Sequence, residues 1–234
     1  MCWAEGGDNM KYSLLENGTD SLKAAFTSLE NFQRNHHLTE HNLKDAIIFF
    51  NHGIEILLKY ILKERSPSLM FSNIDKYLSA KEKMKRKGAT DVFEIDPHLR
   101  TITLEEALKR VEYLCDIDVP DQLKGVILYI NKIRNRIMHY GIDLNEKDAF
   151  ELTKKLNYCL LTAVEFLSLH IPEVVKLIEY ARFEPRNYTL TKEELEKMQE
   201  EFEIQGMIAH EIAREDAYAE MMEQLMENEI QNGK

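Results

Sequence analysis

The chain has 234 residues, of which 44% are hydrophobic, so it can bury a full core as one large domain with an appendage. Nine glycines and five prolines are too few for the many tight turns of a sandwich or barrel, and we predict an all-α fold. The net charge of −11 is uneven, because residues 192–234 contain thirteen acidic and only four basic side chains. The remainder is close to neutral, so composition does not exclude a local cationic site for nucleic acid.

The cysteines and the hydropathy of the chain indicate whether it binds a metal and where in the cell it is located. Cys2, Cys115 and Cys159 are odd in number and lie far apart, which argues against disulfides and a structural zinc site. The histidines of the segment 36–41 have no nearby cysteine or well-placed carboxylate, so neither metal nor cofactor is expected. No segment approaches the roughly 18 apolar residues of a membrane span, and residues 1–7 lack a leader pattern. We expect a cytoplasmic protein that does not bind membranes.

Two long helices are predicted first in the chain. Apolar residues at helical spacing indicate one long or interrupted helix over residues 12–32, with Asn17-Gly18-Thr19-Asp20 as the candidate break. Thr39 is a candidate N-cap for a second helix, residues 43–62, which is apolar around most of its circumference. We expect this second helix at the centre of a bundle. Its principal apolar stripe consists of Leu43, Ile47, Phe50, Ile54, Leu57 and Ile61.

The segment 66–100 has a different character. Prolines stand near both of its ends, and five of the seven residues 81–87 are basic. This pattern predicts an exposed insertion that is either partly helical or mobile. Its basic run either contacts an RNA backbone or is simply a solvated surface, and the sequence does not separate these two interpretations.

Further helices complete the predicted domain. Thr103 begins a helix through Leu114, with Glu106 at the capping-box position, and residues 122–139 form the next helix with Gly141 as its C-terminal cap. A helix over residues 146–169 and a short one over 172–180 follow. The predicted inner face of the former consists of Phe150, Leu152, Leu156, Leu160, Val164 and Leu167.

These elements predict a helical domain over residues 1–190, with the insertion at about 66–100, and an acidic amphipathic helical tail over 191–234. Residues 182–190 have the composition of a linker. The tail either docks on the body or a sister chain, or competes with RNA for a cationic cleft.

The chemically distinctive segment lies at the end of helix 122–139. Residues four apart on a helix differ by only about 40° in azimuth, so Asn135 and His139 lie on one face. Arg134 is long enough to reach the same place. Its planar fork of donors suits phosphoryl oxygens, while the imidazole of His139, favoured in its charged form by the helix dipole, suits proton transfer. Asn135 is predicted to orient His139 or to donate a further hydrogen bond.

The sequence Arg134-Asn135, followed after three residues by His139, resembles the motif of HEPN domains, helical modules of toxins, RNA-processing enzymes and nucleotidyltransferase partners. The order of the predicted helices is also similar over residues 12–180. The resemblance implies a HEPN-like up-and-down bundle, a homodimer and a metal-independent endoribonuclease. Its products would be a 2′,3′-cyclic phosphate and a 5′-hydroxyl. A role in toxicity or defence is also implied.

Three more residues are assigned to substrate binding. Glu55 is predicted to pair with Arg134, Lys59 to lie near a phosphate, and Tyr140 to stack on a base. The alternative for Glu55 and Lys59 is an ordinary ion pair between residues one helical turn apart. Tyrosine-modified HEPN toxins carry one residue between the histidine and the tyrosine, whereas His139 and Tyr140 are adjacent, which argues against control by nucleotidylation of Tyr140.

The sequence therefore favours cleavage of single-stranded or looped RNA by Arg134, Asn135 and His139. Two interpretations from another class stay open. One is a catalytically silent HEPN scaffold that binds RNA or a protein partner, with the motif as a salt-bridged helix end. The other is a regulatory subunit of a nucleotidyltransferase. The expected partners are RNA, a second copy of the chain, and an antitoxin or a nucleotidyltransferase.

Overall fold

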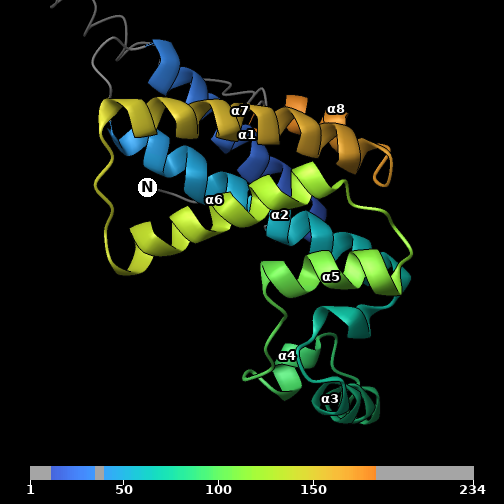
Figure 1. Cartoon of the computed structure of the whole chain (residues 1–234). Helices are drawn as coiled ribbons and strands as arrows, with labels where there is room; N and C mark the ends of the chain where they lie inside the picture. Colours follow the sequence, from blue (N-terminus) through green and yellow to red (C-terminus); the bar gives the residue numbers. More distant parts are fainter. Residues whose placement is uncertain (1–11, 35–39, 183–234) are drawn as a thin grey trace, which may run out of the picture. The chain divides into compact units, whose positions relative to one another are not determined.

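The computed structural model describes residues 12–34 and 40–182, and within these ranges the chain is helical and contains no β-strand (Figure 1). The all-α prediction is confirmed. Both ranges belong to the first of two compact units, residues 1–184. Thr39 and the predicted acidic tail lie outside the described residues. The helices are α1 (Leu14–Arg34), α2 (Glu40–Arg65), the 3₁₀ turn η1 (Pro67–Met70), α3 (Ile74–Lys87), α4 (Val92–Ile95), α5 (Leu104–Leu114), α6 (Asp121–His139), α7 (Glu146–Ser168) and α8 (Val174–Tyr180).

Helix α2 is the central element, as predicted from its apolar circumference. It packs against α1, α5, α6 and α7 as well as η1. A helix surrounded on so many sides must be apolar on most of its surface, which is what the sequence provides. All six side chains of its predicted stripe are buried, namely Leu43, Ile47, Phe50, Ile54, Leu57 and Ile61.

Helices α1 and α2 approach each other closely through two glycines. A Cβ on Gly18 would lie 2.6 Å from Cγ of Leu57, and a Cβ on Gly53 would lie 3.0 Å from the backbone oxygen of Gly18. Of the two predicted alternatives, one long helix or an interrupted one, the structure shows the first, since α1 is continuous from Leu14 to Arg34. The cost of glycine within a helix is offset here by the close helix packing that it allows.

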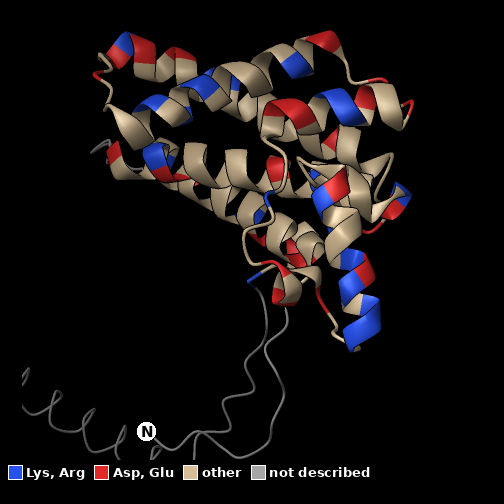
Figure 2. Cartoon of the chain, turned by 90° about the horizontal axis from the view of Figure 1, so that it is seen from below, with Lys and Arg blue, Asp and Glu red and all other residues tan. Residues whose placement is uncertain are grey.

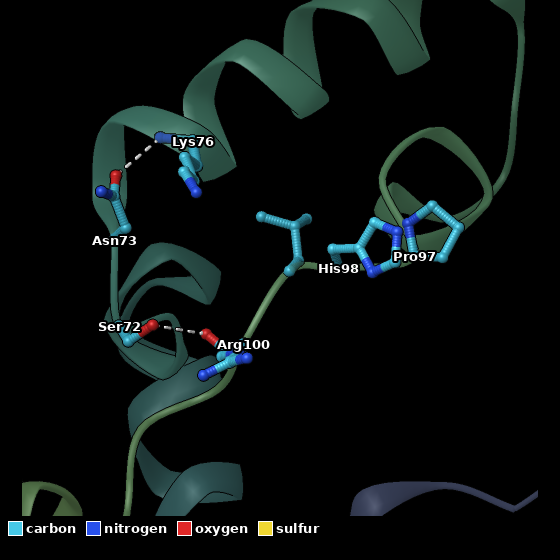
Figure 3. A pocket seen from close by; sticks show the side chains of 7 residues that line it. Ser72, Asn73, Lys76, Pro97, His98 and Arg100 are labelled. Carbon is cyan, nitrogen blue, oxygen red and sulfur yellow. Dashed lines mark hydrogen bonds between the residues drawn. The ribbon is translucent and has the colours of Figure 1, made fainter.

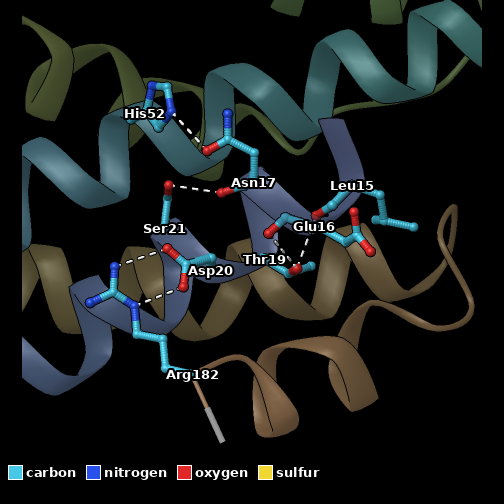
Figure 4. A network of polar contacts seen from close by, with 8 residues as sticks. All are labelled: Leu15, Glu16, Asn17, Thr19, Asp20, Ser21, His52 and Arg182. Atoms are coloured by element: carbon cyan, nitrogen blue, oxygen red, sulfur yellow. Dashed lines mark hydrogen bonds and ion pairs between the residues drawn. The ribbon is translucent and has the colours of Figure 1, made fainter. Parts of the chain in front are cut away.

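Polar contacts tie α1 to its neighbours (Figure 4). Nε2 of His52 in α2 lies 3.4 Å from Oδ1 of Asn17. The Arg182 guanidinium donates two hydrogen bonds to Asp20, at 2.8 and 2.9 Å, and these bonds raise the pKa of Arg182. Arg182, which the sequence placed at the start of a linker, is therefore fixed to α1.

The insertion is helical and has a small hydrophobic core of its own. That core is separate from the main one and consists of Phe71, Tyr77, Ala80, Val92 and Leu99. Arg110 of α5 ties the insertion to the bundle, because it donates to the backbone oxygens of Leu69 and Phe71 at 2.8 and 3.0 Å. The predicted insertion is thus an ordered lobe of α3, α4 and the segment that precedes α5.

The N-caps and the buried faces of the later helices agree with the predictions, with two exceptions. The Thr103 hydroxyl accepts from the backbone N–H of Glu106 at 3.3 Å, but the Glu106 carboxylate bonds to Arg110, so only half of the predicted capping box forms. On α7 the predicted inner face is buried or half-buried apart from Phe150, which is 60% exposed. Phe150 lies in the second turn of α7.

Candidate functional site

The motif lies in the last two turns of α6. Arg134 is half-buried, whereas Asn135 and His139 are exposed. The backbone N–H of Tyr140 still bonds to the oxygen of Arg136 at 2.9 Å, and Gly141 then adopts a left-handed φ of 78°, which ends the helix as predicted. Figure 1 shows this end of α6 on the side of the bundle away from α5 and the insertion.

The Arg134 side chain forms one hydrogen bond and has no acidic partner among the described residues. Its Nη1 donates to Oδ1 of Asn135 at 3.0 Å, and its Nε is buried without a hydrogen-bond partner. No carboxylate of the described residues forms an ion pair with it. A guanidinium carries five donors in a fixed fork, so this one retains donors for a further acceptor.

Glu55 and Lys59 bond to each other and not to the residues of the motif. Nζ of Lys59 donates to Glu55 at 2.6 Å and to the hydroxyl of Thr101 at 3.0 Å, and the Lys59 side chain is 6% exposed. The predicted pairing of Glu55 with Arg134 is not formed, because Glu55 is engaged within its own helix. The observed contact is the alternative given above, an ion pair one turn apart, and it also fastens α2 to the insertion.

His139 is exposed, and its ring makes no hydrogen bond within the described residues. Asn135 was predicted to orient it, but the Asn135 oxygen accepts from Arg134 instead. One chain thus places a single imidazole at this end of α6, and the amide of Asn135 bonds to the guanidinium of Arg134.

Two side chains next to His139 in the sequence are strongly exposed. Met138 is 51% exposed and Tyr140 is 91% exposed, so the Tyr140 ring is free to stack on another group. Phe150 lies elsewhere, on α7, where Nζ of Lys154 lies 4.2 Å from the centroid of its ring. Met138 and Tyr140 therefore give the end of α6 an apolar surface that suits contact with a nucleic-acid base or a second protein chain.

A second cationic feature, which the sequence did not bring together, lies in the insertion. A pocket of about 570 Å³ is lined by residues from the start of α3 and the segment after α4. Figure 3 shows Lys76, His98 and Arg100 arranged around it. The sequence signalled only the basic run 81–87, because Lys76 and Arg100 become neighbours through the fold. The full lining is Ser72, Asn73, Lys76, Pro97, His98, Leu99 and Arg100.

The described part of the chain shows neither a cluster of metal ligands nor a helix that could span a membrane. No three His, Cys, Asp or Glu side chains are placed there to hold a metal ion. His36 and His37 lie outside it. None of the described helices is long and apolar enough to cross a lipid bilayer.

Comparisons with known proteins found no match. No family model, no curated protein sequence and no solved structure matches the chain.

Proposed function

We propose that this protein is a metal-independent endoribonuclease of HEPN type whose site is built on Arg134, Asn135 and His139. The observation that carries the proposal is the state of Arg134, a half-buried guanidinium with no acidic partner in the described residues, close along α6 to an exposed imidazole. Structural arginines are normally paired with carboxylates, as Arg182 is with Asp20. An unpaired one is suited to bind a phosphate.

The chemistry requires three events. A base removes the proton of a ribose 2′-hydroxyl, the resulting oxyanion attacks the adjacent phosphorus, and an acid protonates the departing 5′-oxygen. The products are a 2′,3′-cyclic phosphate and a 5′-hydroxyl. His139 serves as the base or the acid, and Arg134 stabilises the charge on the phosphoryl oxygens. Asn135, which bonds to Arg134 at 3.0 Å, positions the guanidinium.

A second copy of the chain completes the site in this proposal. A single imidazole serves one proton transfer, whereas two motifs across a dimer axis would serve both. The exposed Met138 and Tyr140 beside His139 offer apolar area for such a contact. Sedimentation at micromolar concentration tests this part, and a strict monomer would remove the composite site.

The decisive assay is cleavage of single-stranded and looped RNA in EDTA. We expect His139→Ala and Arg134→Ala to lower the rate by roughly 10²-fold or more. Two controls make the same charge changes at exposed positions: Arg136→Ala, on the same helix, and His41→Ala, on α2. New 5′-hydroxyl ends, labelled by polynucleotide kinase without phosphatase treatment, identify the products. Full-rate cleavage by both motif variants would show that the site is misassigned.

The second candidate is a catalytically silent scaffold. The observation that favours it is that no side chain of the described residues orients the His139 ring, while apolar groups beside it are exposed. Such a protein would bind RNA, an antitoxin or a nucleotidyltransferase through the same surface. It would bind RNA in EDTA without cutting it, and His139→Ala would leave that binding within about twofold of wild type.

A further inference from the structure

The pocket of the insertion brings three cation-forming side chains together without internal partners. Lys76 extends from the first turn of α3, and His98 and Arg100 come from the segment that leads to α5. None of these three side chains forms an ion pair or a side-chain hydrogen bond within the described residues. Of the two carboxylates close to them in sequence, Asp96 accepts from the backbone N–H of His98 at 3.0 Å. The other, Asp75, precedes Lys76 about 100° around α3.

The walls of this pocket are fixed to each other by backbone contacts. The backbone N–H and the hydroxyl of Ser72 both donate to the oxygen of Arg100, at 2.9 and 3.0 Å. Asn73 accepts from the backbone N–H of Lys76 at 2.8 Å and so fixes the start of α3. The basic side chains therefore project from a preformed hollow of about 570 Å³, which is large enough for a nucleotide unit.

A basic stripe leads away from this pocket along α3. Successive helical residues turn by about 100°, so Lys83 and Lys87 lie within about 20° of Lys76 around the axis. The rise of about 1.5 Å per residue puts them roughly 10 and 16 Å farther along. The acidic residues of α3 lie away from this line, and Glu82 is paired with Arg86 at 2.6 Å. Figure 2 shows the basic residues along α3.

We propose that the Lys76–His98–Arg100 pocket and the Lys83–Lys87 stripe form a second RNA-binding site that holds the phosphates of a single strand. The inference rests on the proposed function only in taking RNA as the ligand. Phosphates repeat along a strand, and a pocket followed by a line of cations matches such a polyanion. The site lies in the insertion, away from the motif end of α6 (Figure 1).

A membrane surface fits the same charges less well. Helices that lie on lipid present an apolar face between basic flanks. The exposed apolar residues of α3, Ile74 and Leu78, lie about 160° around the helix from Lys76, so they and the stripe cannot face one surface together.

Binding of a labelled single-stranded RNA to the full chain tests the proposal in EDTA, with His139→Ala present to prevent cleavage. We expect Lys76→Gln/Arg100→Gln to weaken binding about tenfold near 150 mM salt. The slope of log affinity against log salt should fall by about 1.4, because each phosphate contact contributes about 0.7. The control, Lys85→Gln/Lys109→Gln, makes the same charge change at exposed positions, with Lys85 opposite Lys76 on α3.

Three outcomes overturn the proposal. One is that the pocket variant and the control weaken binding equally, since net charge alone would then account for it. Another is that neither variant changes RNA binding. The third is that the pocket variant loses binding to phosphatidylserine vesicles and not to RNA. Failure of the cleavage proposal is separable, because a chain that binds RNA through Lys76 and Arg100 yet cuts none would refute cleavage only.

Discussion

Lys59 in α2 and Arg134 in α6 are both cations of the central bundle, and they differ in what their charged groups contact. Lys59 is buried and reaches two acceptors, Glu55 and Thr101. Among the described residues, Arg134 reaches only the amide of Asn135 and keeps a buried Nε without a partner. Lys59 therefore serves the fold, whereas we propose that Arg134 serves a ligand. Substitutions separate these two roles.

Replacing the paired cation should produce the largest loss of stability. Lys59→Met leaves the Glu55 carboxylate without its partner and breaks the link to Thr101, and we expect a loss of about 3 kcal/mol in the free energy of unfolding. Urea denaturation measures it. Lys63→Met, at an exposed position on the same helix, should change stability by less than about 0.5 kcal/mol. A similar small loss in both variants would mean that Lys59 is not a structural residue.

Two glycines within helices, Gly53 and Gly125, differ in how closely other atoms approach them. Gly53→Ala places a Cβ against the backbone of α1, and we expect a loss of about 2 kcal/mol by overpacking. Gly125→Ala on α6 meets nothing within 4 Å and should instead raise stability by up to about 1 kcal/mol. Thermal unfolding of both variants measures the difference. An equal sign of change at the two positions would contradict the close approach of α1 and α2.

Cys159 is a reactive group that burial makes inert, in contrast to the exposed His139. Desolvation raises the pKa of the Cys159 thiol to about 12. The unfolded thiol ionises near pH 9 while the folded one does not, so its contribution is complete below pH 9 and is lost as pH rises toward 12. Between pH 8 and pH 10 wild type should lose about 1.4 kcal/mol more than Cys159→Ala. Urea unfolding with reductant measures this, and equal losses would contradict burial of the thiol.

Periodicity predicted most of the bundle because each helix buries an apolar face. The central position of α2 and the end of α6 at His139 followed from that pattern. Whether Gly18 interrupts α1 stayed open, since a glycine that ends a helix and one that admits a neighbouring helix look alike in sequence. The exposure of Phe150 was not predicted, because helical spacing alone places it on the inner face of α7.

The candidate site was predictable only within one helix. Spacing placed Arg134, Asn135 and His139 together, and Glu55 with Lys59, because contacts one turn apart are fixed by helix geometry. The pairing of Glu55 with Arg134 spans two helices, and the sequence does not specify which side chain a carboxylate selects. Lys76 and Arg100 escaped notice for the same reason, since only the folded insertion brings them to one pocket.

RNA cleavage and unfolding, measured on the same two variants, test whether Arg134 acts on RNA while Lys59 stabilises the fold. Arg134→Gln should lower the cleavage rate by roughly 10²-fold. Its free energy of unfolding should change by no more than about 1 kcal/mol, because it loses a single exposed hydrogen bond. Lys59→Met should do the reverse, losing stability while the folded fraction cuts RNA at the wild-type rate. The account would be contradicted if Arg134→Gln unfolded as readily as Lys59→Met and its folded fraction still cleaved at full rate.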